Sequence, residues 1–471
     1  MQPPFFCFVF LKLILLADLW DSPVDSSHQE QPSTRRKWIV LLWFVVLATS
    51  YAGERSTFKL LVDRAGPFRL FAVEMVTAVH AILLGISMAA YAFATRKTSS
   101  SRRAAATGSS FRPSAMPNHN SIPEYPDKPL GLGIPLVDVG LMALLDVVNL
   151  ILVFLTGMYV PPTLTVILVQ FLLPLTVFLT QFTHPDGRCS CNRGNRGNDS
   201  VDEMPSTSLP GWGGLSANHL WGSLIILVSV VIAMMPALYS IADPDFFVYA
   251  DPIPLRTACN SLLFLSACIP AAASQLYKEH VFLYYKQPSD LPLLNLVLSV
   301  FQFLFASVLS PLIFGLQGLG AKTDENWSTL YPNTDFSRNF LDGLHCFLQP
   351  GNAADLSEWP EESECDLTLL LTFLNAFSII AVSVAVDRIV QAGATKVMYR
   401  GISAGIMLAV VCMQIYDSSI PDFSYGPLFD AINLICAVLL ILGSEVYHRV
   451  SLTDSTFETV YPPVENLYDN D

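Results

Sequence analysis

The chain has 471 residues, of which 52% are hydrophobic and only 14% are charged, and its formal net charge is -14. Average soluble domains carry about 25% charged residues. This composition therefore excludes an ordinary soluble globule, a disordered chain and a small disulfide scaffold. The acidic balance also argues against a nucleic-acid partner, because such proteins present a basic face. The composition predicts a multi-pass membrane protein.

Ten apolar stretches are long enough to cross a bilayer core, which needs about 20 residues per helix. Each must satisfy its backbone polar groups internally, so each is expected to be an α-helix. Gly66-Pro67 separates the first two stretches, and Pro161-Pro162 opens the fourth, where a missing amide donor costs little. The predicted spans are 38–62, 67–94, 135–155, 159–182, 219–239, 254–276, 291–316, 367–386, 392–416 and 424–447.

The basic residues indicate the orientation of the chain. With a cytosolic N-terminus, most lysines and arginines fall on the inside, many of them in residues 95–134 and 183–218. The positive-inside rule then places both termini in the cytosol. Four basic residues lie instead at the first lumenal turn, and these are Arg55, Lys59, Arg64 and Arg69.

The segments outside the spans divide the chain further. Residues 1–37 form an N-terminal cytosolic tail, whose apolar run predicts an interfacial helix, with a targeting segment as the alternative. Residues 448–471 form an acidic cytosolic tail. Residues 95–134 and 183–218 are rich in small and polar residues and are predicted to be flexible cytosolic loops.

The loop 317–366 is acidic and carries two cysteines, Cys346 and Cys365. The predicted orientation places it in a lumen or outside the cell, where one disulfide between these cysteines is favoured over two free thiols. Such a bridge would contribute about 3 kcal/mol to stability. Asn326 begins the sequon Asn326-Trp327-Ser328 and is a predicted glycosylation site.

Ten spans divide into two halves of five, 38–239 and 254–447, as inverted repeats require. Spans three and four are joined by a tight connection, and so are spans eight and nine. Aligning these connections brings Asp146 within two residues of Asn375. The predicted fold class is an all-α membrane protein with ten transmembrane helices, arranged as two inverted five-helix repeats.

Charged residues inside spans are candidate transport residues. A charge at the bilayer centre costs roughly 2.5–3.5 kcal/mol, so it persists only beside a cavity or a partner. Asp146, in the middle of span three, is predicted to take part in transport. For Arg55 a cavity position competes with an ion pair to Glu54, and for Glu74 it competes with an interfacial position.

Two amides complete this set of candidates. Gln170 and Asn375 are predicted either to contact substrate or to hydrogen-bond neighbouring helices. The predicted substrate-binding residues are Arg55, Glu74, Asp146, Gln170 and Asn375.

Four short stretches in the spans follow one another in a characteristic order. They are Leu144-Leu145-Asp146, Gln170-Phe171-Leu172-Leu173-Pro174, Leu276-Tyr277-Lys278-Glu279 and Phe301-Gln302-Phe303-Leu304-Phe305. Together with the cysteine-bearing loop before span eight, they make the chain resemble the chloroquine-resistance-transporter-like family of the drug/metabolite transporter superfamily.

The resemblance implies a secondary transporter that works by alternating access in an endomembrane, either vacuolar or a plastid envelope. It implies cationic or zwitterionic solutes, namely amino acids, short peptides, glutathione or drugs. Spans five and ten would lie outside the central cavity. Because burial favours the protonated form of a carboxylate, Asp146 or Glu74 is the expected proton acceptor.

Other functions remain as alternatives. A nucleotide-sugar or sugar-phosphate exchanger of the same superfamily would need paired basic side chains deep in the cavity, and only Arg55, Lys59, Lys396 and Arg400 could provide them. A non-transporting receptor or scaffold is a second alternative. An enzyme is disfavoured, because the histidines lack metal-ligand or acyl-transfer spacing. The expected partners are a small-molecule substrate, protons and the lipid bilayer, with no cofactor, metal or nucleic acid.

Overall fold

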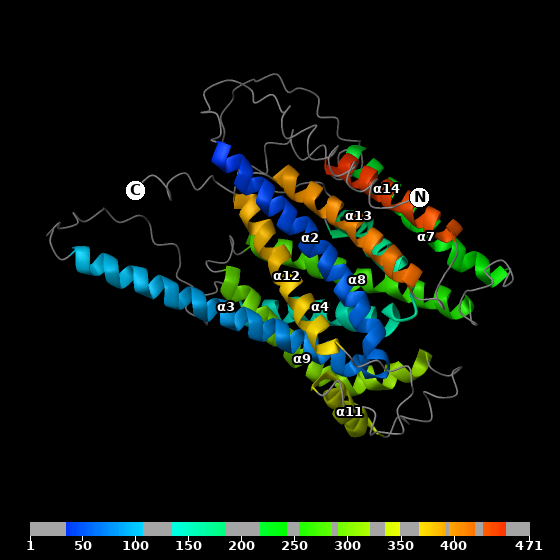
Figure 1. The fold of residues 1–471 in the computed structure, drawn as a ribbon, viewed down its shortest axis with the longest axis horizontal. Helices are drawn as coiled ribbons and strands as arrows, with labels where there is room; N and C mark the ends of the chain where they lie inside the picture. Colours follow the sequence, from blue (N-terminus) through cyan, green and yellow to red (C-terminus); the bar gives the residue numbers. More distant parts are fainter. Residues whose placement is uncertain are drawn as a thin grey trace, which may run out of the picture.

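The computed structural model describes the chain over residues 34–106, 134–183, 217–242, 254–284, 291–320, 335–348, 367–391, 395–419 and 427–448. Every regular element in these ranges is a helix (Figure 1). The helices are α2 (Thr34–Ala65), η1 (Gly66–Phe68), α3 (Arg69–Ala106), α4 (Leu136–Gly157), α5 (Pro162–Val169), α6 (Leu172–Thr183), α7 (Ala217–Ala242), α8 (Pro254–Tyr284), α9 (Leu291–Gly320), α11 (Phe336–Leu348), α12 (Thr368–Gln391), α13 (Thr395–Ser419) and α14 (Pro427–His448).

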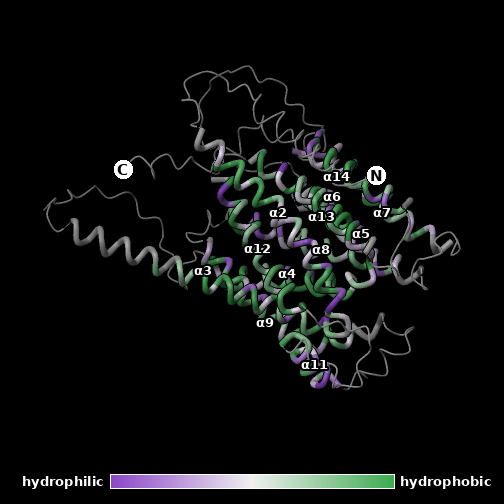
Figure 2. Tube along the Cα trace, viewed as in Figure 1, coloured by the Kyte–Doolittle hydropathy of each residue, from purple (hydrophilic) through white to green (hydrophobic). Residues whose placement is uncertain are grey.

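The structure confirms the prediction of an all-helical protein with ten spans. The described residues contain 10 candidate membrane spans, with α5 and α6 together forming the fourth. Apolar residues cover most of the length of these helices (Figure 2). Many large apolar side chains point out of the bundle, among them Val308 and Phe377. Such an outer surface suits lipid rather than water.

The helices pack in a definite pattern. α2 lies along α12 and α13, α4 lies along α8 and α9, and α3 packs on α9 (Figure 1). The fifth and tenth spans, α7 and α14, pack on each other at one edge of the bundle. Each of the central pairs α2–α12, α2–α13, α4–α8 and α4–α9 joins the first half of the chain to the second. The inverted relation between the halves stays a prediction.

Two segments expected to be loops contain helix. The prediction of a flexible loop over 95–134 is wrong at its start, because α3 continues to Ala106. Residues 95–106 contain no glycine or proline and several alanines and arginines, which favour helix. In the loop predicted over 317–366, α11 packs its aromatic face on α3, and Phe71 meets the rings of Phe340 and Phe347 at 5.2 and 5.1 Å.

The break between the first two spans lies where it was predicted. Gly66 has φ 46°, a backbone conformation that glycine adopts without the steric cost of a side chain. Pro67 follows in the short 3₁₀ turn η1, and α3 begins directly after it. The two residues therefore convert one long apolar run into two spans.

The fourth span is discontinuous. In a regular helix the amide of residue 174 would donate to the carbonyl of Gln170, but Pro174 has no amide hydrogen. The Gln170 carbonyl instead accepts from the Leu173 amide at 3.2 Å, which tightens the turn between α5 and α6. The side chain of Gln170 thus lies at a break inside a membrane span.

Candidate functional site

The carboxylate of Asp146 on α4 lies at the centre of a polar cluster. Lys278 Nζ donates to Oδ2 at 2.7 Å, and Gln302 Nε2 donates to the same oxygen at 3.0 Å. Ser274 Oγ donates to Oδ1 at 2.6 Å. The Asp146 and Lys278 side chains keep 23% and 28% of their exposure. The cluster therefore joins α4, α8 and α9 without being sealed in the core.

The cluster brings together three of the stretches on which the family resemblance rests. Asp146 was expected as a transport residue, whereas Lys278 and Gln302 were named only as members of the motifs and were given no role. Both belong to motifs that the sequence displays, Leu276-Tyr277-Lys278-Glu279 and Phe301-Gln302-Phe303. The sequence did not show that the helices carrying these motifs pack on the helix that carries Asp146.

A second contact joins α4 to α8 closer to the start of α4. Tyr277 Oη donates to Asp138 Oδ1 at 2.8 Å. Asp138 and Asp146 are eight residues apart and face the same neighbour, as helical periodicity requires. The two carboxylates therefore differ in partner, since one faces a phenol and the other an ammonium group.

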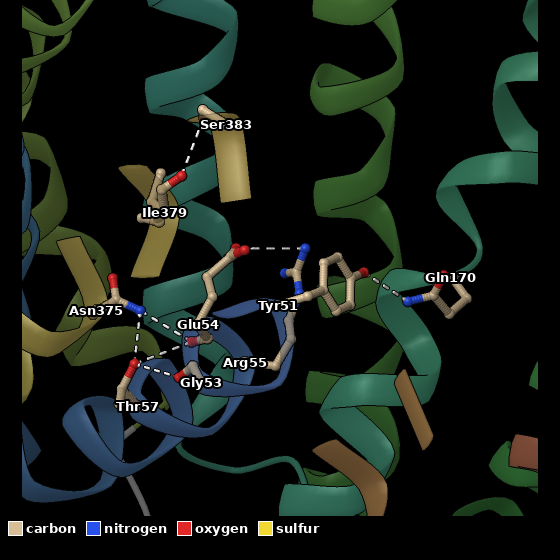
Figure 3. A network of polar contacts seen from close by, with 9 residues as sticks. All are labelled: Tyr51, Gly53, Glu54, Arg55, Thr57, Gln170, Asn375, Ile379 and Ser383. Carbon is tan, nitrogen blue, oxygen red and sulfur yellow. Dashed lines mark hydrogen bonds and ion pairs between the residues drawn. The ribbon is translucent and has the colours of Figure 1, made fainter. Parts of the chain in front are cut away.

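Arg55 and Glu54 on α2 form a second polar site (Figure 3). The distance from Arg55 Nη2 to Glu54 Oε1 is 3.6 Å. The guanidinium carbon of Arg55 lies 5.2 Å from the centroid of the Tyr51 ring. The Tyr51 hydroxyl accepts a hydrogen bond from Gln170 Nε2 at 3.1 Å, at the α5–α6 break.

The amides Gln170 and Asn375 both make helix-to-helix hydrogen bonds. Asn375 Nδ2 on α12 donates to the backbone carbonyl of Glu54 at 3.0 Å and to Thr57 Oγ1 at 3.3 Å. Asn375 therefore holds the turn of α2 that carries Glu54 and Arg55 (Figure 3). Of the two roles expected for these amides, the contacts agree with hydrogen bonding between helices. Contact of either amide with a substrate stays a prediction.

Glu74 on α3 takes part in none of the contacts described above for the two polar sites. Its side chain is buried between α3 and α9, where it hydrogen-bonds Ser310. The role of Glu74 in substrate binding stays a prediction.

Two of the basic residues around the turn between α2 and α3 cap the end of α4. Lys59 Nζ donates to the Gly157 carbonyl at 2.8 Å and to Asp63 Oδ1 at 2.6 Å. Arg69 Nη1 donates to the Leu155 carbonyl at 2.8 Å. Cations at a helix C-terminus satisfy free carbonyls and complement the helix dipole. Lys59 and Arg69 therefore have a structural role at the end of α4.

Arg400 is engaged at the periphery. Its Nε lies 3.3 Å from Oε1 of Glu445, across the α13–α14 contact. The side chain of Lys396 lies outside the described residues. Of the four basic residues considered for a phosphorylated substrate, Lys59 and Arg400 are thus committed to other partners.

The structure describes only part of the loop 317–366, in which a disulfide and a glycosylation site were predicted. Cys346 on α11 is buried and disulfide-bonded. Its expected partner Cys365 and the predicted glycosylation site Asn326 lie outside the described residues, so both assignments stay predictions. Among the described cysteines, Cys259, Cys268, Cys412 and Cys436 are free thiols.

Comparison with known families connects this geometry to a function. The family model described as CRT-like, chloroquine-resistance transporter-like, matches residues 215–447. This region is CRT-like. The match runs from the start of α7 to the end of α14, and it therefore includes Lys278 and Gln302 but not Asp146. A search of the curated proteins finds no match to the chain.

The CRT-like assignment implies a membrane transporter of the drug/metabolite type. A transporter of this type has a small-molecule substrate and works within a lipid bilayer, which agrees with the ten apolar helices.

Proposed function

We propose that this CRT-like protein moves small cationic or zwitterionic solutes across an endomembrane by alternating access, coupled to protons. The observation that supports the coupling is the Asp146 cluster, in which a carboxylate of one half of the chain pairs with Lys278 of the other half. α4, α8 and α9 would have to move relative to one another when a central cavity opens alternately to the two sides.

Protonation of Asp146 is the proposed switch. The deprotonated carboxylate holds Lys278 and Gln302 through charge-assisted hydrogen bonds, which are roughly twice as strong as neutral ones. A proton on Asp146 removes the opposite charge that Lys278 needs and weakens the contact between α4 and α8. The proton would thus favour the state in which these helices separate.

The pairing also changes how a solute would interact with Asp146. The sequence suggested a bare carboxylate that attracts cations, but Lys278 already neutralises it. A cationic group of the solute would have to replace Lys278, or the solute would have to bind elsewhere. Asp146 therefore fits a coupling role better than a direct cation site.

The sugar-phosphate alternative finds less support in the packing. Lys59 caps α4, and Arg400 pairs with Glu445. Arg55 and Lys396 remain, but only Arg55 has a described side chain, and a phosphorylated solute would be expected to need more than one basic group.

Uptake into proteoliposomes tests the proposal. Labelled arginine and glutathione are offered with and without an imposed pH gradient to the wild type and to Asp146→Asn. Asp138→Asn is the matched control, because it makes the same change at the same α4–α8 interface but at a carboxylate paired with a phenol. We expect Asp146→Asn to lose stimulation by the gradient, and Asp138→Asn to retain it.

Two other outcomes would contradict the proposal. Gradient-driven uptake that persists in Asp146→Asn would show that the coupling site is elsewhere. Absence of flux for both solutes in the wild type would contradict the solute class, and sugar phosphates would then be the next substrates to test.

A further inference from the structure

Arg55 is held more loosely than the other described basic side chains discussed above. Lys59 and Arg69 donate to carbonyl oxygens at 2.8 Å. Arg55 Nη2 instead lies 3.6 Å from the Glu54 carboxylate, beyond the usual length of a hydrogen bond. Its Nε is buried and has no hydrogen-bond partner. An arginine with unused donors inside a membrane span requires an explanation, because desolvating such a group is costly.

The side chain also remains accessible. Arg55 and Glu54 keep 26% and 20% of their side-chain exposure, whereas Lys59, one turn further along α2, keeps 2%. Both side chains point away from the α2 axis to the same side (Figure 3). Arg55 is close to Cys268 on α8, and Tyr51 beneath it contacts Gln170 at the α5–α6 break. The Arg55 side chain therefore has neighbours from α8 as well as from α2, close to the α5–α6 break.

We infer that Arg55 and Glu54 form a subsite for a zwitterionic solute, with Arg55 binding its carboxylate and Glu54 its ammonium group. This inference rests on the proposed function and specifies the class of solute. In an α-amino acid the two charges are attached to the same carbon, so they lie next to each other, as the charges of Glu54 and Arg55 do.

Electrostatics favours this exchange of partners. The guanidinium fork can bind a carboxylate through two parallel hydrogen bonds. The α-ammonium and α-carboxylate groups of a bound amino acid replace one long ion pair with two direct ones, and together they add no net charge at the subsite. A solute with only a positive charge would instead leave Arg55 beside an uncompensated cation.

The surrounding residues hold this subsite in place. Asn375 fixes the backbone carbonyl of Glu54, and the Tyr51 ring supports the guanidinium through a cation–π contact. Gln170 orients the Tyr51 hydroxyl. These three are therefore positioning residues, and only Arg55 and Glu54 would touch the charged groups of the solute.

Binding to the purified full-length protein tests the inference separately from transport. Three probes are compared by calorimetry in detergent: arginine, argininamide, which lacks the carboxylate, and Nα-acetylarginine, which lacks the α-ammonium group. We expect the wild type to bind arginine at least tenfold more tightly than either analogue. A site built for a charged group loses much of its affinity when that group is removed.

Variants assign the two halves of the subsite. Arg55→Gln is expected to bind arginine and argininamide equally, and Glu54→Gln to bind arginine and Nα-acetylarginine equally. Arg55→Lys keeps the charge but loses the fork, so it should retain part of the discrimination. Arg400→Gln, which removes another ion-paired arginine from a span, should bind as the wild type does.

The affinities of the wild type for the three probes test the inference even if a variant does not fold. Equal affinity for arginine and argininamide, or no binding of arginine, would overturn the inference. If arginine were transported into proteoliposomes but bound no more tightly than its analogues, the proposed function would still hold and the subsite would be contradicted. Discrimination in binding without any flux would keep the subsite and remove the proposed function.

Discussion

Asp146 on α4 and Lys278 on α8 form a 2.7 Å ion pair between residues that are 132 positions apart in the chain. The pair joins the first half of the protein to the second at the level of a membrane span. Because both side chains are also partly exposed, it combines a structural contact with access for a proton or a solute.

The Asp146–Lys278 pair is expected to contribute to stability in a non-additive way. Lys278→Met leaves a partly buried carboxylate without its cation and should lower the free energy of unfolding by about 1–3 kcal/mol. Asp146→Asn combined with Lys278→Met should recover part of this loss, since no charge is then unpaired. Chemical unfolding in mixed micelles measures the four members of this cycle. Strict additivity would mean that the ion pair contributes nothing.

Lys59→Met is expected to be strongly destabilising. The buried ammonium serves both Asp63 and the Gly157 carbonyl, so its loss leaves two groups without a donor and should cost about 2–4 kcal/mol. Arg338→Met is the matched control, because Arg338 also pairs with an aspartate four residues on, Asp342, but is 54% exposed. That change should stay within about 0.5 kcal/mol. If both substitutions lowered the free energy of unfolding equally, the proposed capping role of Lys59 would be contradicted.

The contact between α7 and α14 depends on small residues. A Cβ atom at Gly443 would lie 2.7 Å from the Ile226 side chain and 3.0 Å from the Gly222 carbonyl oxygen. Gly443→Ala should therefore push the helices apart and cost about 1–3 kcal/mol. Gly315→Ala on α9 meets nothing within 4 Å and should be neutral or slightly stabilising. Thermal unfolding in detergent compares the stability of the two variants. An unchanged stability of Gly443→Ala would contradict the close approach of α7 and α14.

Pro174→Ala is expected to repair the break in the fourth span. The new amide can donate to the Gln170 carbonyl, which shifts the Gln170 side chain away from Tyr51. Stability should be unchanged or higher, while arginine uptake should fall about tenfold. Pro236→Ala, within the peripheral helix α7, is the control and should leave uptake unchanged. Full activity of Pro174→Ala would show that the break has no part in transport.

The disulfide of Cys346 is expected to include Cys365. Cys346→Ser and Cys365→Ser should each lower the free energy of unfolding by about 3 kcal/mol, the value for a loop of about this length. The double variant should lose no more than either single one. Peptide mapping without reduction identifies the partner directly, and a bridge from Cys346 that survives in Cys365→Ser would show that the pairing is different.

The sequence predicted the membrane class, the ten spans and the break at Gly66-Pro67, because these depend on local properties. It did not predict the break between α5 and α6 inside the fourth span. Runs of apolar residues must form helices in lipid, since no water is present to satisfy the backbone. Gly66-Pro67 separates the first two spans, and most described ends of the spans fall within a few residues of those expected. The exceptions are α3 and α8, which continue to Ala106 and Tyr284, beyond the expected ends at 94 and 276. The four motifs also carried the CRT-like resemblance, although each is short.

Only the tertiary structure decided which side chains face one another. Lys278 looks like an ordinary flanking charge until α8 is placed beside α4, and Lys59 looks like a charge on the wrong side until it meets the end of α4. Glu74 and Asp146 are equally plausible carboxylates in the sequence, but packing encloses one between α3 and α9 and gives the other a cation. The physical reason is that the energy of a charge in a membrane is set by its nearest partners, and these come from distant parts of the chain.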